Sequence, residues 1–136
     1  MNVLVDTDVL LDVALDRTPW ADDSLAFLDH CQAGRCSCRV SWHSLATVFY
    51  VASGAGSSRA REFIRELLAF AEVAPVAHQD MLLALELEMA DLEDAMQIAA
   101  AMACRATRIV TRNIKDFRNS PVRAATPAKF LKEFGT

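Results

Sequence analysis

Short apolar runs alternate with helical patterns along this chain, and that alternation restricts its fold more than any other feature. Val3-Leu4-Val5 and residues 107–111 have the composition of buried strands, and further strands are expected at residues 35–40, 73–77 and 121–124. Pro75 lacks a backbone N–H, so the strand at 73–77 is expected at a sheet edge or with irregular pairing. Strands that alternate with helices predict βαβ units, and therefore an α/β fold whose parallel sheet is covered by helices on both faces.

Helical spacing and end signals locate the intervening helices. One helix is expected soon after Asp6, and a second has Pro19 in its first turn and ends near Gly34. Ser41 is the expected N-cap of a third helix, which ends in the Gly- and Ser-rich stretch 53–57. Further helices are expected around residues 63–68, at 81–89 and from Asp91 to about residue 102. The 136 residues contain no linker or repeat, so we expect one domain spanning residues 1–136.

The charge of the chain is unevenly distributed. A net charge of −4 and a pI near 5.3 argue against broad, non-specific affinity for nucleic acid. Eight of the 14 basic residues nevertheless lie in the last quarter of the chain, from Arg105 to Lys132, while acids dominate before it. This asymmetry predicts one basic surface.

The N-terminal segment and the cysteines indicate the cellular compartment. Residues 1–8 reach two carboxylates without a basic start, unlike a secretory signal peptide, and no apolar stretch approaches the roughly 20 residues that span a bilayer. The four cysteines show no paired CxxC spacing, which favours reduced, buried, structural thiols: Cys31, Cys36, Cys38 and Cys104. We therefore expect a cytoplasmic protein with no membrane segment.

Three groups of acidic residues occur where strands end or helices begin. Asp6 directly follows Val3-Leu4-Val5, and the carboxyl ends of strands are where open α/β sheets bind ligands. Asp91 and Asp94 lie in the first turn of a helix and three residues apart, hence on one face. Asp116 lies in a polar loop that follows the predicted strand 107–111.

Each group also has a simpler interpretation. In the first group, Thr7 or Asp8 would serve only as the cap of the following helix. Acids in the first turn of the helix at Asp91 complement its dipole and resemble a capping box. The Asp-Phe pair at Asp116 is also typical of an ordinary turn. The conjunction of the three groups favours a shared site over three separate local roles.

Converging carboxylates require a counter-charge. Several carboxylates held close together raise one another's pKa unless a cation neutralises them. Oxygen ligands of this kind suit Mg²⁺ or Mn²⁺, which can activate water for attack on a phosphodiester.

In this order, the motifs resemble those of PIN-domain nucleases, including the toxin ribonucleases of VapC-type toxin–antitoxin pairs. The resemblance runs from Val3 to Asp12, through Asp94-Ala95 and the Ala-rich helix, to Thr111-Arg112-Asn113 and Lys115-Asp116-Phe117. It implies a Rossmann-like α/β/α sandwich and metal-dependent hydrolysis of RNA.

Carried over by position, the resemblance implies that Asp6, Asp94 and Asp116 are the catalytic acids and bind Mg²⁺ or Mn²⁺. We expect the substrate to be contacted by a set of polar and basic residues beside them: Thr7, Thr111, Arg112, Asn113 and Lys115. The resemblance and the apolar excess of the chain together predict a homodimer and an antitoxin protein as partners.

One position departs from the family pattern. The family often has Glu where this chain has Thr47, and a threonine adds no charge to a metal site. A subgroup of the family also lacks this Glu. His43, four residues earlier, shares a helical face with Thr47 and is interpreted as a surface or core residue more readily than as a substrate-binding one.

Two alternatives remain open at the level of sequence. A degenerate PIN domain would bind RNA or protein without cleavage, and Thr47 motivates that interpretation. Val3-Leu4-Val5-Asp6-Thr7-Asp8 also resembles the first motif of haloacid-dehalogenase-type phosphatases, although only Asp116 and Glu133 remain after Thr111 to supply that family's later acids.

Overall fold

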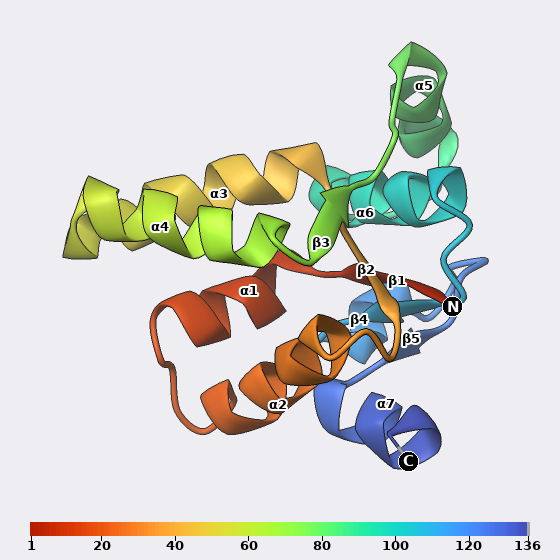
Figure 1. Ribbon diagram of the computed structural model, residues 1–136. Coiled ribbons are helices and arrows are strands. Elements are labelled where there is room, and N and C mark those ends of the chain that lie inside the picture. The colour runs from red at the N-terminus through yellow and green to blue at the C-terminus, as the bar shows by residue number, and fades with distance from the viewer. Residues whose placement is uncertain (136) are drawn as a thin grey trace.

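The computed structural model describes residues 1–135 and contains five parallel strands in the order β3-β2-β1-β4-β5 (Figure 1). The strands are β1 (Asn2–Val5), β2 (Ser37–Val40), β3 (Ala71–Val73), β4 (Arg108–Val110) and β5 (Ala124–Ala125). The predicted α/β sandwich with a parallel sheet is confirmed. The chain moves outward from β1 through β2 to β3, then returns to the other side of β1 for β4 and β5, so the order reverses between β1 and β4.

Helices cover the sheet and extend past its edge. They are α1 (Thr7–Ala14), α2 (Ala21–Gln32), α3 (Trp42–Ala52), α4 (Ser57–Leu68), α5 (His78–Glu86), α6 (Leu92–Ala103) and α7 (Pro127–Phe134), with short 3₁₀ helices η1 (Ser53–Ala55) and η2 (Ile114–Phe117). Figure 1 shows α2 and α7 below the sheet, α6 above it, α3 and α4 side by side, and α5 projecting from the body. Within residues 1–135, no helix is long and apolar enough to cross a membrane.

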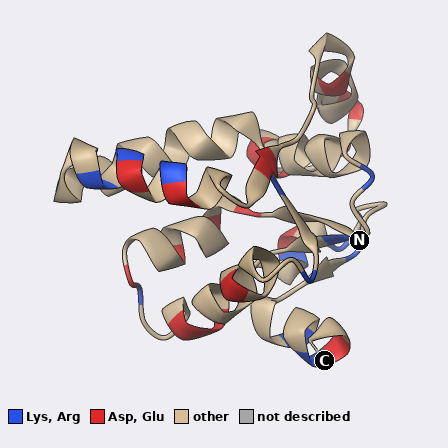
Figure 2. Ribbon diagram, viewed as in Figure 1, with Lys and Arg blue, Asp and Glu red and all other residues tan. Residues whose placement is uncertain are grey.

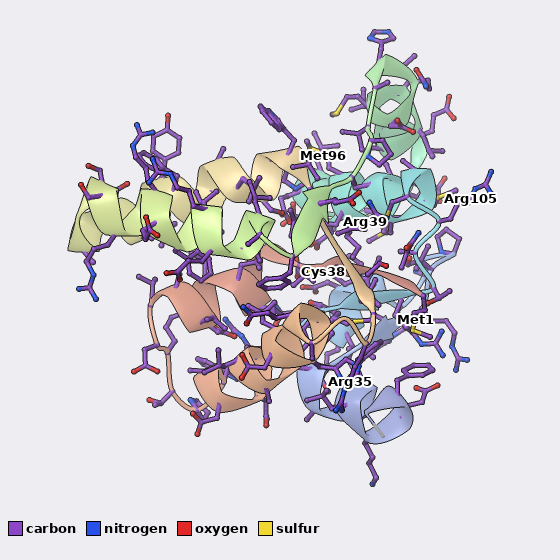
Figure 3. All side chains as sticks on the ribbon, viewed as in Figure 1. Met1, Arg35, Cys38, Arg39, Met96 and Arg105 are labelled. Atoms are coloured by element: carbon purple, nitrogen blue, oxygen red, sulfur yellow. The ribbon has the colours of Figure 1, made fainter. Side chains whose placement is uncertain are left out.

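The alternation of side chains along the strands creates two cores. Val3 and Val5 of β1 face the larger core, which includes Phe27 of α2 and Phe130 of α7. Leu4 faces the other side, where Ile98 of α6 belongs to a smaller, alanine-rich core. In β2, Cys38 joins the larger core while its neighbour Arg39 pairs with Glu72 of β3; Figure 3 labels both β2 residues. This two-sided burial explains why Val3, Leu4 and Val5 of β1 are all apolar.

Several element boundaries differ from the sequence prediction. The third strand ends at Val73, before Pro75, although its predicted place at a sheet edge is confirmed. The next helix covers His78–Glu86 rather than 81–89, and the last strand is Ala124–Ala125 rather than 121–124. Pro19 lies in the turn before α2, which begins at Ala21, so its predicted place in the helix is wrong.

All four cysteines are free and buried, as predicted. The Sγ atoms of Cys31 and Cys36 lie 3.2 Å apart, at the point where the chain passes from α2 towards β2. Their burial in the larger core accounts for their structural role.

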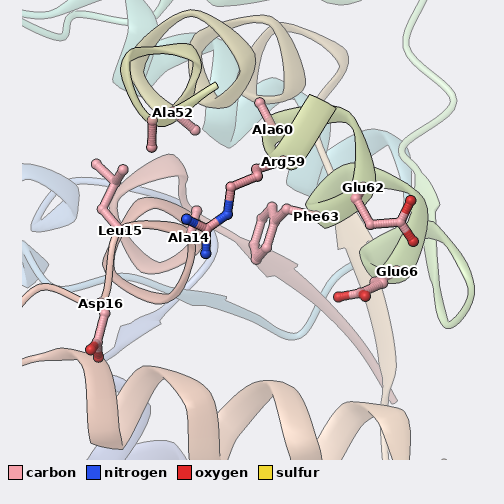
Figure 4. Close-up of a pocket in the computed structure, with 10 residues that line it drawn as sticks. Ala14, Leu15, Asp16, Ala52, Arg59, Ala60, Glu62, Phe63 and Glu66 are labelled. Carbon is pink, nitrogen blue, oxygen red and sulfur yellow. The ribbon is translucent and has the colours of Figure 1, made fainter. Parts of the chain in front are cut away.

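A pocket of about 490 Å³ lies between α1 and α4. Arg59 extends across it, near Ala14 and Phe63, with Asp16 and Glu66 at its margins (Figure 4). None of the predicted site residues lines this pocket. The three acids of the predicted site, Asp6, Asp94 and Asp116, therefore lie outside this pocket.

Candidate metal centre

Three neighbouring strands place polar residues at the same edge of the sheet. Val40, Val5 and Val110 are paired across β2, β1 and β4, and the next residues are Ser41, Asp6 and Thr111. The backbone N–H of Asp6 still donates to the Val110 carbonyl at 2.9 Å. All three polar residues are buried. They lie at the carboxyl ends of the strands where the strand order reverses, which is the usual ligand site of such sheets.

Asp6 is fixed by hydrogen bonds from three directions. Its Oδ1 accepts from the Thr7 backbone N–H at 2.8 Å and from Gln97 Nε2 at 3.2 Å, and its Oδ2 accepts from the Thr111 hydroxyl at 2.8 Å. The N-cap of α1 is Asp6 itself, so the simpler interpretation, in which Thr7 or Asp8 caps this helix, is wrong. Burial, together with the charges of Glu93 and Asp8, raises the pKa of Asp6 from 3.8 to about 6.

Asp94 lies on the first turn of α6, the helix that packs on the Leu4 side of the sheet. Asp91 is the N-cap of α6 and accepts from the Glu93 N–H at 2.8 Å, as predicted. The Asp94 side chain accepts no hydrogen bond within residues 1–135, so it does not complete a capping box with Asp91. Burial, followed by the charges of nearby acids, raises the pKa of Asp94 from 3.8 to about 7; in decreasing order of effect these acids are Asp91, Glu93, Asp6 and Asp116. Asp6 and Asp116 are thus each close enough to Asp94 for their charges to raise its pKa.

Asp116 is exposed on η2, in the polar loop after β4. Asn113 precedes this turn, and its side-chain amide donates to Asp8 on α1. Its backbone N–H donates to the Thr111 hydroxyl at 3.0 Å. These contacts attach the loop to α1 and to the end of β4, and so hold Asp116 at the same edge as Asp6.

Gln97 connects the elements of the site, and sequence reasoning missed it. Its side chain is fully buried on α6. Its Nε2 lies 2.8 Å from Ser44 Oγ, 3.1 Å from Thr7 Oγ1 and 3.2 Å from both Asp6 Oδ1 and Glu93 Oε1, while its Oε1 accepts from Ser41 Oγ at 2.6 Å. A polar residue on the buried face of an alanine-rich helix was the signal that could have identified it.

Ser41 and Ser44 take part in the same network from α3. Ser41 is the N-cap residue of α3, as predicted, but its side chain makes no capping hydrogen bond and serves Gln97 instead. Ser44 Oγ lies 2.8 Å from Thr7 Oγ1. Thr7 therefore supports the acids from within the protein.

Arg112 is engaged by neighbouring side chains. Its guanidinium donates to the fully buried Asp12 at 2.9 and 3.1 Å and lies 4.0 Å over the ring of Trp20. Arg17 also binds the Oδ1 atom of this carboxylate, at 3.1 Å. Lys115 is exposed beside Asp116 and has no such partner among the described side chains.

A family model described as the PIN domain matches residues 2–115. The chain belongs to the PIN-domain family. The match covers most of the chain and decides against the haloacid-dehalogenase alternative. It also includes Asp6 and Asp94, whereas Asp116 lies one residue beyond its end. No curated protein matches the chain closely.

Solved structures share the fold of this PIN domain. VapBC2 from Rickettsia felis, bound to a promoter DNA fragment, has a TM-score of 0.71 at 18% identity, over 93% of this chain and 98% of that one. A toxin–antitoxin complex from Klebsiella pneumoniae gives 0.68 at 23% identity, over 92% and 97%. FitAB bound to an IR36 DNA fragment gives 0.67 at 16% identity, over 92% and 94%. At these identities the likeness concerns the fold.

The donor set of this PIN domain suits a hard divalent cation. Asp6, Asp94 and Asp116 offer carboxylate oxygens only. Burial and neighbouring negative charges raise the pKa values of the first two, and a bound cation would favour their ionised forms. As they stand, no three of the His, Cys, Asp and Glu side chains in residues 1–135 are gathered to hold a metal ion. Mg²⁺ commonly retains several of its own waters, so a site of this kind needs few direct protein ligands.

Proposed function

We propose that this PIN domain is a divalent-metal-dependent endoribonuclease, with Asp6, Asp94 and Asp116 as its catalytic, metal-binding acids. The observation that carries the proposal is that two acids lie near one edge of the sheet. Asp6 is buried and accepts three hydrogen bonds, and the pKa of Asp94 is raised by burial and by the charges of the other acids. Structural groups seldom retain such unfavourable charge without a functional reason.

In the proposed reaction, the cation, Asp6 and Thr111 have different roles. Mg²⁺ or Mn²⁺, when bound, would supply an activated water and charge stabilisation for the leaving oxygen. Asp6 holds a fixed orientation because three donors bind its two oxygens. The Thr111 hydroxyl is one of those donors and also accepts from the Asn113 N–H, so it couples Asp6 to the loop that carries Asp116. A prearranged site of this kind is what in-line attack on a phosphodiester requires.

The RNA backbone is proposed to follow a groove next to Asp116. Lys115, Arg118 and Arg123 line a groove of about 350 Å³ beside η2. All three side chains are exposed and can therefore neutralise phosphates. Arg112, which the sequence also favoured for this role, has its guanidinium occupied by Asp12 and Trp20.

The decisive experiment is cleavage of an RNA pool. We expect the protein to cut RNA in Mn²⁺ or Mg²⁺, to stop in EDTA, and to lose activity by about a hundredfold or more in Asp6→Asn and Asp94→Asn. Asp29→Asn, an exposed change on α2, should leave the rate unchanged. Absence of cleavage by the wild type, with no heat of Mn²⁺ binding in calorimetry, would instead favour a PIN domain that binds without cutting. The observation that favours this second candidate is the presence of Thr47 where the family often has Glu.

We also propose that this protein is the toxin of a toxin–antitoxin pair and forms a homodimer. The similar folds from Klebsiella pneumoniae and Rickettsia felis were crystallised as complexes named for such pairs. In this chain, α3 exposes Trp42 and Tyr50 at 71% and 78%, and an apolar groove lies between α3 and α4. Exposed aromatic groups of this kind favour a protein partner. Light scattering that shows a monomer at all concentrations would refute the homodimer.

A further inference from the structure

Helix α3 lacks the acid that a PIN domain often carries there. Thr47 occupies that position, is exposed, and donates its hydroxyl to the His43 carbonyl at 3.2 Å. The Thr47 hydroxyl therefore binds its own helix, and α3 adds no carboxylate to the site.

Glu93 of α6 contacts α3 at His43, which lies one helical turn before Thr47. Its Oε1 lies 3.1 Å from His43 Nε2. An ionised carboxylate only accepts hydrogen bonds, so the imidazole N–H is the donor. This hydrogen bond is the main reason that the pKa of Glu93 lies below its usual value. The acid that faces α3 is thus a charged residue from another helix.

Glu93 also lies beside Asp6. Gln97 Nε2 is 3.2 Å from an oxygen of each carboxylate, so one amide group bridges the two acids. Thr7, the residue after Asp6, donates to Glu93 Oε1 at 3.1 Å. The charge of Glu93 is the largest of those that raise the pKa of Asp6. Both observations place Glu93 within the acidic site.

The hydrogen bonds of Glu93 leave one oxygen available. His43, Thr7 and Gln97 all bind Oε1, and within residues 1–135 no group donates to Oε2. The side chain is 40% exposed. Three donors on one oxygen fix the direction in which the other points.

We propose that Glu93 is a further cation ligand of this PIN domain and replaces the acid that is absent at Thr47. Glu93 Oε2 is the ligand oxygen, directly or through one water of the ion. His43 and Gln97 are positioning residues that orient Glu93. The inference rests on the proposed metal-dependent function, since it concerns the same site.

The test is a calorimetric titration of MnCl₂ into the metal-free protein of residues 1–136. Glu93→Gln is expected to weaken Mn²⁺ binding by about tenfold or more. Glu93→Asp keeps the charge but withdraws the oxygen by one carbon–carbon bond, and should also weaken binding. Asp91→Asn is the matched control, because asparagine retains the N-cap and removes one charge two residues away; it should change affinity by no more than about threefold at 0.15 M salt. Melting temperatures in EDTA verify that each variant is folded.

The outcomes separate this inference from the proposed function. Wild-type affinity in Glu93→Asp, or equal losses in Glu93→Gln and Asp91→Asn, would show that Glu93 acts only through its charge and would overturn the inference alone. A wild-type protein that binds no Mn²⁺ overturns both. Should Glu93→Gln fail to fold, Glu93→Asp decides the matter by itself, because it keeps the negative charge and changes only the position of the oxygens.

Discussion

Asp94 carries a negative charge that the metal-free protein does little to balance. Its carboxylate is half-buried, accepts no hydrogen bond within residues 1–135, and faces Asp91, Glu93, Asp6 and Asp116. A carboxyl whose pKa is raised by folding favours the native state only while it is protonated. The contribution of Asp94 to stability is therefore present below about pH 4 and lost as the pH rises through about 7.

We expect Asp94→Asn to stabilise the metal-free protein. At pH 8 in EDTA the gain in unfolding free energy should be about 1–2 kcal/mol after allowance for solvent screening, and it should vanish near pH 3.5. Denaturant unfolding at the two pH values measures it, with Asp29→Asn as the control. Mn²⁺ should reverse the order at pH 8, since it binds the wild type more tightly. An equal gain at both pH values would contradict the electrostatic explanation.

At the scale of single residues, the sequence pointed to the acidic residues of the candidate site but not to the neutral residues that hydrogen-bond to them. Asp6, Asp94 and Asp116 stood out because carboxylates next to buried strands or helices are conspicuous in the pattern. Gln97 and Ser44 are neutral, and their roles depend on contacts between residues more than 50 positions apart. Such contacts follow only from the packing of α6 and α3 against the end of β1.

Among the elements, α7 completes the larger core although it lies beyond the matched family segment. Phe130 is fully buried, with its ring 5.2 Å from Phe27 of α2 in an edge-to-face arrangement and 4.9 Å from Phe134. Thr126 caps the helix through its hydroxyl, and Pro127 occupies the first turn. These local signals fix the start of α7, while Phe130 determines which face is buried.

Phe130→Ala should cost about 3–5 kcal/mol of unfolding free energy, because it leaves a cavity between α2 and α7. Urea unfolding measures the loss. Lys132→Ala, an exposed change on the same helix, should alter stability by less than about 0.5 kcal/mol. A small effect of Phe130→Ala would mean that α7 is not part of the cooperative core.

Element boundaries were less predictable than element types. The sequence predicted the parallel sheet, the edge position of the third strand and a helix after each strand up to β4. It placed the third strand at Pro75, but the chain leaves the sheet at Val73, and Ala74 retains one hydrogen bond to Val40 at 2.8 Å. The ends of short strands depend on which backbone groups find a neighbour, and the sequence pattern does not record that.

For the molecule as a whole, the basic residues do not form one uniform surface. Figure 2 shows Lys and Arg on α4 as well as near the C-terminal part of the chain. Within the basic stretch 105–132, Arg108 pairs with Glu133 and Arg112 with Asp12. The charges that remain beside the acidic site are those of Lys115, Arg118 and Arg123.

This division gives a prediction for RNA binding in EDTA, where cleavage is blocked. Lys115→Gln with Arg118→Gln should weaken binding and reduce the slope of log affinity against log salt by about 0.7 per lost phosphate contact. Arg112→Gln should instead lower stability by about 1–3 kcal/mol, because it leaves the buried Asp12 with Arg17 alone, and should keep the slope. The matched control is Lys129→Gln with Lys132→Gln on α7. A flattened slope in Arg112→Gln would return that residue to the RNA surface.

The single amide of Gln97 has a consequence for the energetics of turnover. It joins the loop after β1, the start of α3 and the first turns of α6, so these three segments cannot shift independently without breaking buried hydrogen bonds. The conformational entropy of gathering them was lost once, when the chain folded. In the proposed nuclease, each arriving substrate would then meet an Asp6 that is already oriented, and the barrier to reaction would not include the cost of orienting it.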